Sequence, residues 1–264
     1  MTHYRQILVQ ISDDIATITL NRPDKKNALS FSMMDELIDA AKSIKKQRHL
    51  RAVILEGAGA DFCSGLDLAD LNNPKNMAFA AYQLIKPTPS KFQQVCLIWR
   101  SLPVPVIAVI DGVCVGGGLQ LALGADIRMA SDQARFSVLE AKWGLVADMG
   151  ITQTAADVRR DHVAKLAMTA QMIDAEAALA AGIVTQVSDD PKAHAKSLIK
   201  DIKARSPDAV LAAKRVMYAD RRLDYLALYQ EKLWQIRLML GKNRKLAIIK
   251  AKDDSVSFIK RQFR

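Results

Sequence analysis

The sequence predicts an α/β fold made of repeated strand, turn and helix units, followed by a helical C-terminal region. Two observations carry this prediction. Short, nearly all-apolar runs typical of strands buried on both faces recur in the first part of the chain, and each leads through a glycine-rich turn into a helical pattern. From about residue 160 onward the pattern is helical, without strands of its own. We therefore expect a layered or spiral α/β core over residues 1–200 and a helical region over residues 201–264.

Composition and charge limit the classes of function. The chain has 264 residues, of which 50% are hydrophobic and 25% charged, as in an ordinary globular protein. Lysine and arginine number 38 against 28 acidic residues, a net charge of +10, which is compatible with an anionic partner such as a phosphorylated small molecule. The basic residues are scattered and lack the interleaved aromatics of single-strand binders, so we expect no nucleic-acid partner.

Cysteine and histidine usage points to a reducing compartment and to no metal site. Cys63, Cys96 and Cys114 are odd in number and lie in apolar segments, which argues against a disulfide framework. The four histidines lie far apart without the spacing of metal ligands. No apolar run approaches the length of a membrane span, and the N-terminus lacks an apolar signal core. We expect a cytoplasmic protein without membrane contact.

The first elements are a hairpin and a helix. Apolar residues alternate over residues 7–11 and 16–20 on either side of the sequence SDD, which predicts two half-buried antiparallel strands. The segment NRPDKKNALS then breaks regular structure. Ser32, with Asp35 three residues later, resembles a capping box at the start of a helix over residues 32–47.

Two strand, turn and helix units follow. The first is the buried strand RAVILEG, the turn GAGADFCSG and a short helix; the second is VPVIAVIDG, VCVGGG and LQLALGA. A third strand, DIRMAS, and a short extended piece come next. Between the two units, residues 72–100 contain three prolines and predict either a mobile flap over a ligand or a helix pair with a kink.

The helical region carries an apolar stripe. Its members recur at helical spacing along one segment: Tyr225, Leu228, Tyr229, Leu233, Ile236 and Leu240. Such a stripe has to be buried against the core or against another copy of the chain. Self-association is therefore expected.

The two glycine turns are the first candidate site. Each places backbone N–H groups at the start of a helix, where no side chain blocks the approach of an anion. If the turns face one another, they form a hole for an oxyanion or enolate; each turn alone is better explained by close strand–helix packing. Glu140 and Asp148 flank a further glycine turn downstream.

Five blocks, in order, resemble the crotonase (enoyl-CoA hydratase/isomerase) superfamily over nearly the whole chain. They are NRPDKKNAL, GAGADFCSGLDL, PVIAVIDGVCVGGGLQLALGADIRMA, ARFSVLEAKWGLVADMG and DDSVSFIKR. The resemblance implies a crotonase-like fold, in which ββα units wind into a superhelix and a C-terminal helical region packs trimers, often paired into hexamers. The partners that it implies are therefore a coenzyme A thioester as substrate and further copies of the chain. No separate cofactor is implied.

The resemblance also implies site residues. The thioester carbonyl would lie between two backbone N–H groups, which carry over to Ser64 and Gly117. Coenzyme A would lie near the positions Lys25, Ala28, Ser64, Gly65, Leu66 and Asp67, with Phe258 and Lys260 contributed by this chain or a neighbour. The reactions of the family pass through a thioester enolate, so these donors would face developing negative charge.

The acid–base residues decide the reaction. In the resemblance, the two carboxylates that hydrate an enoyl thioester fall on Gln120 and Glu140, and Gln120 is an amide. An amide holds water or substrate but transfers no proton at neutral pH. Loss of a general acid or base lowers the reaction rate by roughly a hundred- to ten-thousand-fold. Moving a double bond needs one base, which Glu140 supplies. Double-bond isomerisation is therefore the leading hypothesis.

Asp148 leaves two interpretations open. The spacing of Glu140 and Asp148 resembles that of the Δ3,5-Δ2,4-dienoyl-CoA isomerases, which use a glutamate and an aspartate as a relay pair but carry a third acid at the position of Gln120. Asp148 also fits a helix N-cap or turn residue. Hydration, another enolate reaction such as decarboxylation, and an acyl-CoA-binding pseudoenzyme remain the alternative functions.

Overall fold

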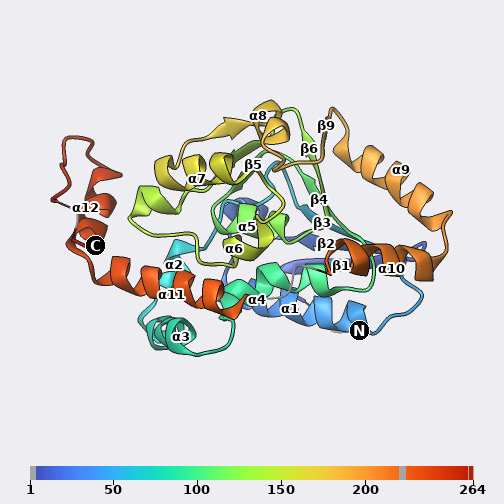
Figure 1. The fold of residues 1–264 in the computed structure, drawn as a ribbon, viewed down its shortest axis with the longest axis horizontal. Coiled ribbons are helices and arrows are strands. Elements are labelled where there is room, and N and C mark those ends of the chain that lie inside the picture. Colours follow the sequence, from blue (N-terminus) through green and yellow to red (C-terminus); the bar gives the residue numbers. More distant parts are fainter. Residues whose placement is uncertain (1–3, 220–223, 261, 264) are drawn as a thin grey trace.

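The computed structural model describes residues 4–219, 224–260 and 262–263 and shows the expected α/β architecture (Figure 1). A six-stranded sheet has the order β1-β2-β3-β4-β6-β9. Its strands are Ile7–Ser12, Ile15–Leu20, Ala52–Gly57, Val106–Ile110, Ile127–Ser131 and Gln186–Ser188. A smaller sheet has the order β5-β7-β8, formed by Val113–Val115, Arg135–Ser137 and Ile173–Asp174.

The predicted hairpin is confirmed. β1 and β2 pair antiparallel, and Ser12 lies opposite Ile15, so the turn has only two residues. These residues, Asp13 and Asp14, have φ angles of 52° and 59°, the left-handed conformation that a tight hairpin turn requires. From β2 to β9 the strands of the large sheet pair in parallel, as the buried apolar runs predict.

The first long helix, α1 (Phe31–Lys45), begins earlier than predicted. Its N-cap is Ser30, whose side chain accepts the Met33 amide at 3.0 Å. The capping box assigned to Ser32 is therefore wrong, because Ser32 already lies inside the first turn of the helix. α1 packs its apolar face, including Leu37, into the main core.

Residues 72–100 form the helix pair that was one of the two interpretations of this segment. After the short helix α2 (Leu68–Leu71) come α3 (Pro74–Ile85), α4 (Lys91–Leu97) and the 3-10 helix η2 (Trp99–Ser101). A capping box begins α4, because Ser90 accepts the Gln93 amide and the Gln93 side chain accepts the Ser90 amide. α4 is anchored in the core, whereas much of α3 is exposed.

The second glycine turn lies in the centre of the molecule (Figure 1). β5 leads through Gly116, with φ of 55°, into α5 (Gly117–Leu123), of which every residue is buried. A Cβ atom on Gly118 would lie 2.4 Å from the Cys63 carbonyl oxygen, so the two strand–turn–helix units pack in direct backbone contact. Close packing is thus one reason for the glycines.

The expectation that no strand follows residue 160 is wrong. The two-residue β8 and three-residue β9 are interspersed with the helices η3 (Glu140–Trp143), α6 (Ile151–Thr154), α7 (Arg160–Thr169), α8 (Ala175–Ala180) and α9 (Pro191–Lys203). Such short strands carry too few residues for a recognisable alternation. α9 covers one face of the large sheet through Ala195 and Ile199. The boundary predicted at residues 200/201 falls inside this helix.

The C-terminal helices are α10 (Pro207–Met217), α11 (Tyr225–Leu240) and α12 (Lys242–Lys250). The apolar stripe predicted on α11 is not packed against the core of the same chain: Leu228 is buried, but Tyr225 is 58% and Leu240 is 83% exposed. The buried face of α11 carries Glu231, Lys232 and Gln235 instead. In the described part of the chain, no helix is long and apolar enough to cross a membrane.

Candidate active site

The two glycine turns face one another, as the oxyanion hypothesis requires. Gly65 has φ of 99°, and a Cβ atom there would lie 3.2 Å from the Val115 carbonyl oxygen and 3.5 Å from the Gly117 amide nitrogen. Only glycine satisfies both the conformation and the space. The Gly117 amide donates to no acceptor among the described residues and is available to a ligand.

The prediction that Ser64 supplies the second free amide is wrong. The Ser64 amide donates to the Lys26 carbonyl at 2.9 Å and is already engaged. Two positions later, Leu66 forms a parallel bridge with Leu29. The Leu29 amide donates to the Gly65 carbonyl at 2.8 Å, and the Asp67 amide donates to the Leu29 carbonyl at 3.0 Å. In this parallel bridge the amide of Leu66 points to the opposite side, where Gly117 lies, and it has no acceptor in the described chain.

Glu140 lies beside this pair of turns. It is the first residue of η3, and its Oε1 would lie 3.6 Å from a Cβ atom built on Gly116. Its other oxygen, Oε2, is buried without a hydrogen-bond partner in the described structure. Burial raises the pKa of Glu140, and hydrogen bonds from its own amide and from Gln120 offset this only in part. Such a carboxylate is a stronger base than an exposed glutamate.

Gln120 joins Glu140 to the segment that carries Asp148. Its Nε2 donates to Glu140 Oε1 at 2.7 Å, and its Oε1 accepts the Met149 amide at 2.9 Å. Gln120 is 1% exposed. It therefore positions the base and cannot itself exchange protons.

Asp148 is 7% exposed and is not a helix cap. The N-cap of α6 is Gly150, and no other residue in the described chain hydrogen-bonds the Asp148 carboxyl. Burial, together with the charges of Glu231 and Glu140, holds the pKa of Asp148 well above its usual range. Glu140 and Asp148 are thus two interacting carboxyl groups in different environments, an arrangement typical of an acid–base pair.

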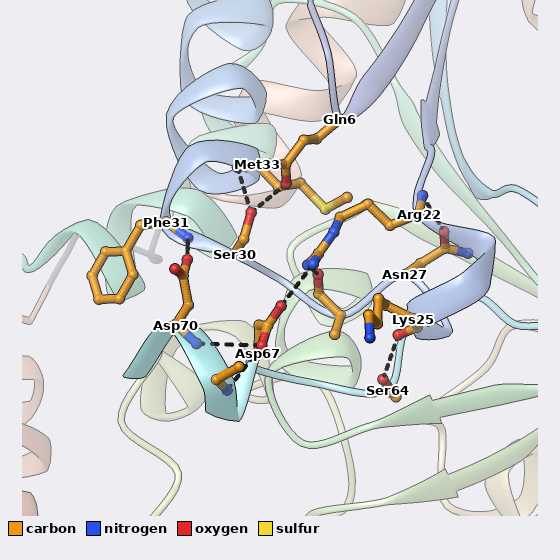
Figure 2. Close-up of polar contacts among 12 residues, drawn as sticks. Gln6, Arg22, Lys25, Asn27, Ser30, Phe31, Met33, Ser64, Asp67 and Asp70 are labelled. Atoms are coloured by element: carbon orange, nitrogen blue, oxygen red, sulfur yellow. Dashed lines mark hydrogen bonds and ion pairs between the residues drawn. The ribbon is translucent and has the colours of Figure 1, made fainter. Parts of the chain in front are cut away.

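The loop around Lys25 and the first glycine turn form one polar cluster (Figure 2). Ser64 Oγ donates to the Lys25 carbonyl at 3.4 Å, and Arg22 donates to the Ala28 carbonyl at 2.6 Å. Arg22 also forms an ion pair with Asp67 at 2.7 Å. The structure therefore brings together Lys25, Ala28 and the turn from Ser64 to Asp67, six of the positions assigned to coenzyme A.

The sequence predictions missed Arg22 and Asn27, which hold this cluster. Asn27 is fully buried; it accepts the Arg22 amide at 2.9 Å and donates to the carbonyls of Ala58 and Asp61 at 2.8 and 2.7 Å. The signal was present in the NRPDKKNAL block, where both residues stand. They act by tying the loop after η1 (Pro23–Lys25) to the glycine turn.

Phe258 and Lys260 are not brought to this cluster. Both are exposed, Phe258 by 53%, in a tail that is hydrogen-bonded to α12 through Asn243 and Ile259. Among the described residues, the structure shows no contact between them and the cluster. Figure 1 shows the tail beside α12, at the end of the molecule to which α11 leads.

Cys63 lies in the first glycine turn, but its thiol is unsuited to nucleophilic attack. Cys63 is fully buried, and burial raises the pKa of its thiol to about 12, so it is not a nucleophile. No group of histidine, cysteine and carboxylate side chains in the described ranges is arranged to hold a metal ion.

Comparisons with known proteins identify the family of this chain. The family model described as "Enoyl-CoA hydratase/isomerase" matches residues 10–237. The mitochondrial Delta(3,5)-Delta(2,4)-dienoyl-CoA isomerase of Rattus norvegicus is 34% identical over 259 residues, covering 92% of this chain and 79% of that protein. The 1,2-epoxyphenylacetyl-CoA isomerase of Escherichia coli is 33% identical over 190 residues, covering 70% of each chain.

A solved structure shows the same fold. The enoyl-CoA hydratase/isomerase from Pseudoalteromonas atlantica superposes with a TM-score of 0.84 at 24% identity, covering 97% of this chain and 100% of that one. The predicted crotonase-like α/β fold is thereby confirmed. From the family model over residues 10–237 and the 34% identity to a dienoyl-CoA isomerase, this chain belongs to the enoyl-CoA hydratase/isomerase family.

Proposed function

We propose that this protein isomerises the double bonds of an unsaturated acyl-coenzyme A thioester and that its preferred substrate is a 3,5-dienoyl thioester. The observation that carries the proposal is the pair of interacting carboxyl groups, Glu140 and Asp148, of which Glu140 lies beside the turns that carry two free backbone amides. The 34% identity to a dienoyl-CoA isomerase supports the same substrate class.

The amides of Leu66 and Gly117 are the proposed oxyanion donors. They bind the thioester oxygen, on which negative charge develops when the α-carbon loses a proton. One such donor typically contributes roughly a hundred- to a thousand-fold in rate, because it is already oriented when the charge forms. Lys25, Ala28 and the turn from Ser64 to Asp67 hold the coenzyme A portion in this proposal.

Glu140 is the proposed base. Its carboxylate lies next to Gly116, one residue before the Gly117 donor. In this proposal it faces the α-carbon of the bound thioester. It removes a proton from C2, and the electrons of the C–H bond delocalise into a trienolate held by the two amides. The hydrogen bond from Gln120 supports the ionised form of Glu140 before this step.

Asp148 is the proposed acid. Its raised pKa keeps it protonated at a pH at which Glu140 is ionised, so it can deliver a proton to C6 of the trienolate. The double bonds then stand at C2 and C4, and the thioester carbonyl is restored. Transfer of a proton from Glu140 back to Asp148 returns the site to its starting state, so the net reaction consumes nothing.

Gln120 disfavours hydration. Its side-chain NH₂ donates to Glu140, and its side-chain oxygen accepts the Met149 amide. Gln120 therefore supplies no second carboxylate to activate a water molecule. A hydratase with two glutamates is therefore not supported by this site.

Three thioesters separate the possible reactions. Purified protein is incubated with 3,5-dienoyl, trans-3-enoyl and trans-2-enoyl coenzyme A, and ultraviolet absorbance follows the gain or loss of conjugation. The proposal predicts the fastest turnover for the 3,5-dienoyl thioester. Faster loss of the trans-2-enoyl chromophore would identify a hydratase, and binding without turnover of any of the three would identify a pseudoenzyme.

The same proposal includes an assembly. The exposed apolar side of α11 is suited to contact between copies in a homotrimer, or in a hexamer as a dimer of trimers, and Phe258 and Lys260 then reach the coenzyme A site of a neighbour. We also propose that the enzyme works without a separate cofactor and in the cytoplasm.

A further inference from the structure

The buried polar face of helix α11 contacts the segment that carries Asp148. Glu231 Oε2 accepts the Gly150 amide at 2.9 Å, and Glu231 Oε1 accepts the Thr152 amide at 2.9 Å and the Thr152 hydroxyl at 2.6 Å. One turn along the helix, Gln235 accepts the Val146 amide at 3.1 Å. Two side chains of α11 therefore hold both ends of the segment 146–152.

We propose that Glu231 is a positioning residue of the acid–base site, acting from the C-terminal helix through the turn that carries Asp148. The inference rests on the proposed isomerase function. It adds a residue outside the sequence blocks that resemble the family, on a helix whose apolar stripe was expected to pack against the core or another copy of the chain.

The first step is geometric. The Asp148 carboxyl has no hydrogen bond from any other residue in the described structure, so its position depends on the backbone that carries it. That backbone is held at Val146 by Gln235, at Met149 by Gln120, and at Gly150 by Glu231. Gln120 also holds Glu140, so α11 and α5 together fix the separation of the acid and the base.

The second step concerns charge. Glu231 is 5% exposed, and besides its bonds to Gly150 and Thr152 it accepts Gln93 Nε2 at 3.0 Å. Four donors favour the ionised carboxylate and offset part of the penalty of burying it, although burial still raises its pKa. A glutamine at this position could accept at only one of the two oxygens, because its NH₂ group donates, so the ionised carboxylate both holds the turn and adds a negative charge near Asp148.

That charge acts on Asp148. The carboxyl groups that face it are Glu231 from α11 and Glu140 from η3, and the Cys96 thiol of α4 lies in the same electrostatic environment. The negative charges of both carboxylates disfavour ionisation of Asp148, so Asp148 retains its proton. Glu231 thereby helps to separate the two roles: Glu140 accepts a proton, and Asp148 donates one.

Two variants separate charge from position through two readouts, the alkaline limb of the pH profile and kcat. Glu231→Gln removes the charge at nearly constant size, and Asp148 should then lose its proton more easily. The alkaline limb of the pH profile of kcat/KM is expected to move to lower pH by about one unit. Glu231→Asp keeps the charge but shortens the side chain, so kcat should fall by about 10- to 100-fold while the limb stays in place.

Lys232 provides the matched control. It is the next residue of α11, is equally buried, and donates to the carbonyls of Lys86 and Thr88 at 2.5 and 3.0 Å without contacting the segment 146–152. Lys232→Met should lower Tm but leave the alkaline limb where it is in the wild type. An equal movement of the limb in Lys232→Met would assign the effect to general loosening of the helix and overturn the inference.

A measurement without turnover keeps this inference separate from the proposed reaction. Titration of ¹³C-labelled aspartate carboxyls by NMR, with the Asp148 signal assigned from Asp148→Asn, should show a lower midpoint in Glu231→Gln than in the wild type. An unchanged midpoint overturns the inference. If the midpoint falls but no thioester is converted, the isomerase proposal fails and the role of Glu231 stands. If Glu231→Gln does not fold, Glu231→Asp alone is measured. A kcat equal to that of the wild type in this variant would overturn the positioning role.

Discussion

Gln120 donates a hydrogen bond from Nε2 to Oε1 of Glu140 at 2.7 Å. The same side chain accepts the Met149 amide, one residue after Asp148. The position that would supply a second acid in a two-carboxylate hydratase is therefore occupied by an amide that holds the base and ties it to the turn of the second carboxyl group. This relationship favours transfer of a proton within the substrate over addition of water.

Glu140→Gln is expected to lower turnover by roughly a hundred- to ten-thousand-fold, because it removes the proposed base while preserving size. The affinity for acyl-coenzyme A should change little, since the free amides and the Arg22–Asp67 cluster remain. Steady-state kinetics and calorimetric titration measure the two effects. A fully active variant would contradict the assignment of Glu140.

Gln120→Glu is expected to increase hydration of a trans-2-enoyl thioester, because it introduces an acid within 2.7 Å of Glu140. Isomerisation should decrease, since two carboxyl groups at this distance compete for one proton. Gln120→Met is the control: it removes both hydrogen bonds without adding an acid, so both activities should fall. Hydration that stays at or below the wild-type level in Gln120→Glu counts against the role given to this position.

Asp148→Asn is expected to stabilise the fold more at higher pH. Because the pKa of Asp148 is raised in the folded state, the folded protein retains a proton that the unfolded chain releases near pH 4. The wild type therefore loses stability as the pH rises from about 4 through the folded pKa, and the variant lacks this loss. Urea unfolding should show a gain over the wild type that is larger at pH 8 than at pH 5, by about 1 to 3 kcal/mol. A gain independent of pH would show that Asp148 is ionised throughout.

Gly65→Ala tests the pair of facing turns. The new methyl group would lie 3.2 Å from the Val115 oxygen and 3.5 Å from the Gly117 amide nitrogen, at the proposed oxyanion site, so kcat should fall. Gly182→Ala is the matched control, because Gly182 also has a positive φ, 76°, but its nearest neighbour lies 4.0 Å away. Both variants carry a backbone penalty of about 1 kcal/mol. Equal kinetic effects in the two would mean that strain alone explains the loss.

Leu240→Lys tests the proposed assembly. Leu240 is 83% exposed at the end of α11, and a charge there should weaken contacts between copies. Light scattering after size-exclusion chromatography should show a smaller species than for the wild type. Met168→Lys, at a residue that is 77% exposed on α7, is expected to leave the mass unchanged. A wild-type mass in Leu240→Lys would exclude this end of α11 from the interface.

Features fixed by local pattern could be predicted from the sequence. The hairpin follows from alternation over residues 7–20, and the glycine turns follow from the positions of buried strands. The choice between Ser64 and Leu66 could not, because the direction of each amide depends on pairing with Lys26 and Leu29, nearly 40 residues away in the chain.

The buried side of α11 is a second feature that the sequence hides. Apolar periodicity predicted burial of the stripe that includes Tyr225 and Leu240, whereas the face turned to the core carries Glu231, Lys232 and Gln235. These polar side chains are buried because backbone groups of distant loops satisfy them, and no local pattern encodes those partners.

The most direct measurement of the central claim is the conversion of a 3,5-dienoyl thioester in D₂O, followed by NMR and mass spectrometry. Hydration of a trans-2-enoyl thioester is measured in parallel. The account predicts a 2,4-dienoyl product without added oxygen, lost in Glu140→Gln, at a kcat/KM at least about a hundredfold above that of hydration. A hydroxyacyl product formed faster than the diene, or a diene formed equally well by Glu140→Gln, would contradict it.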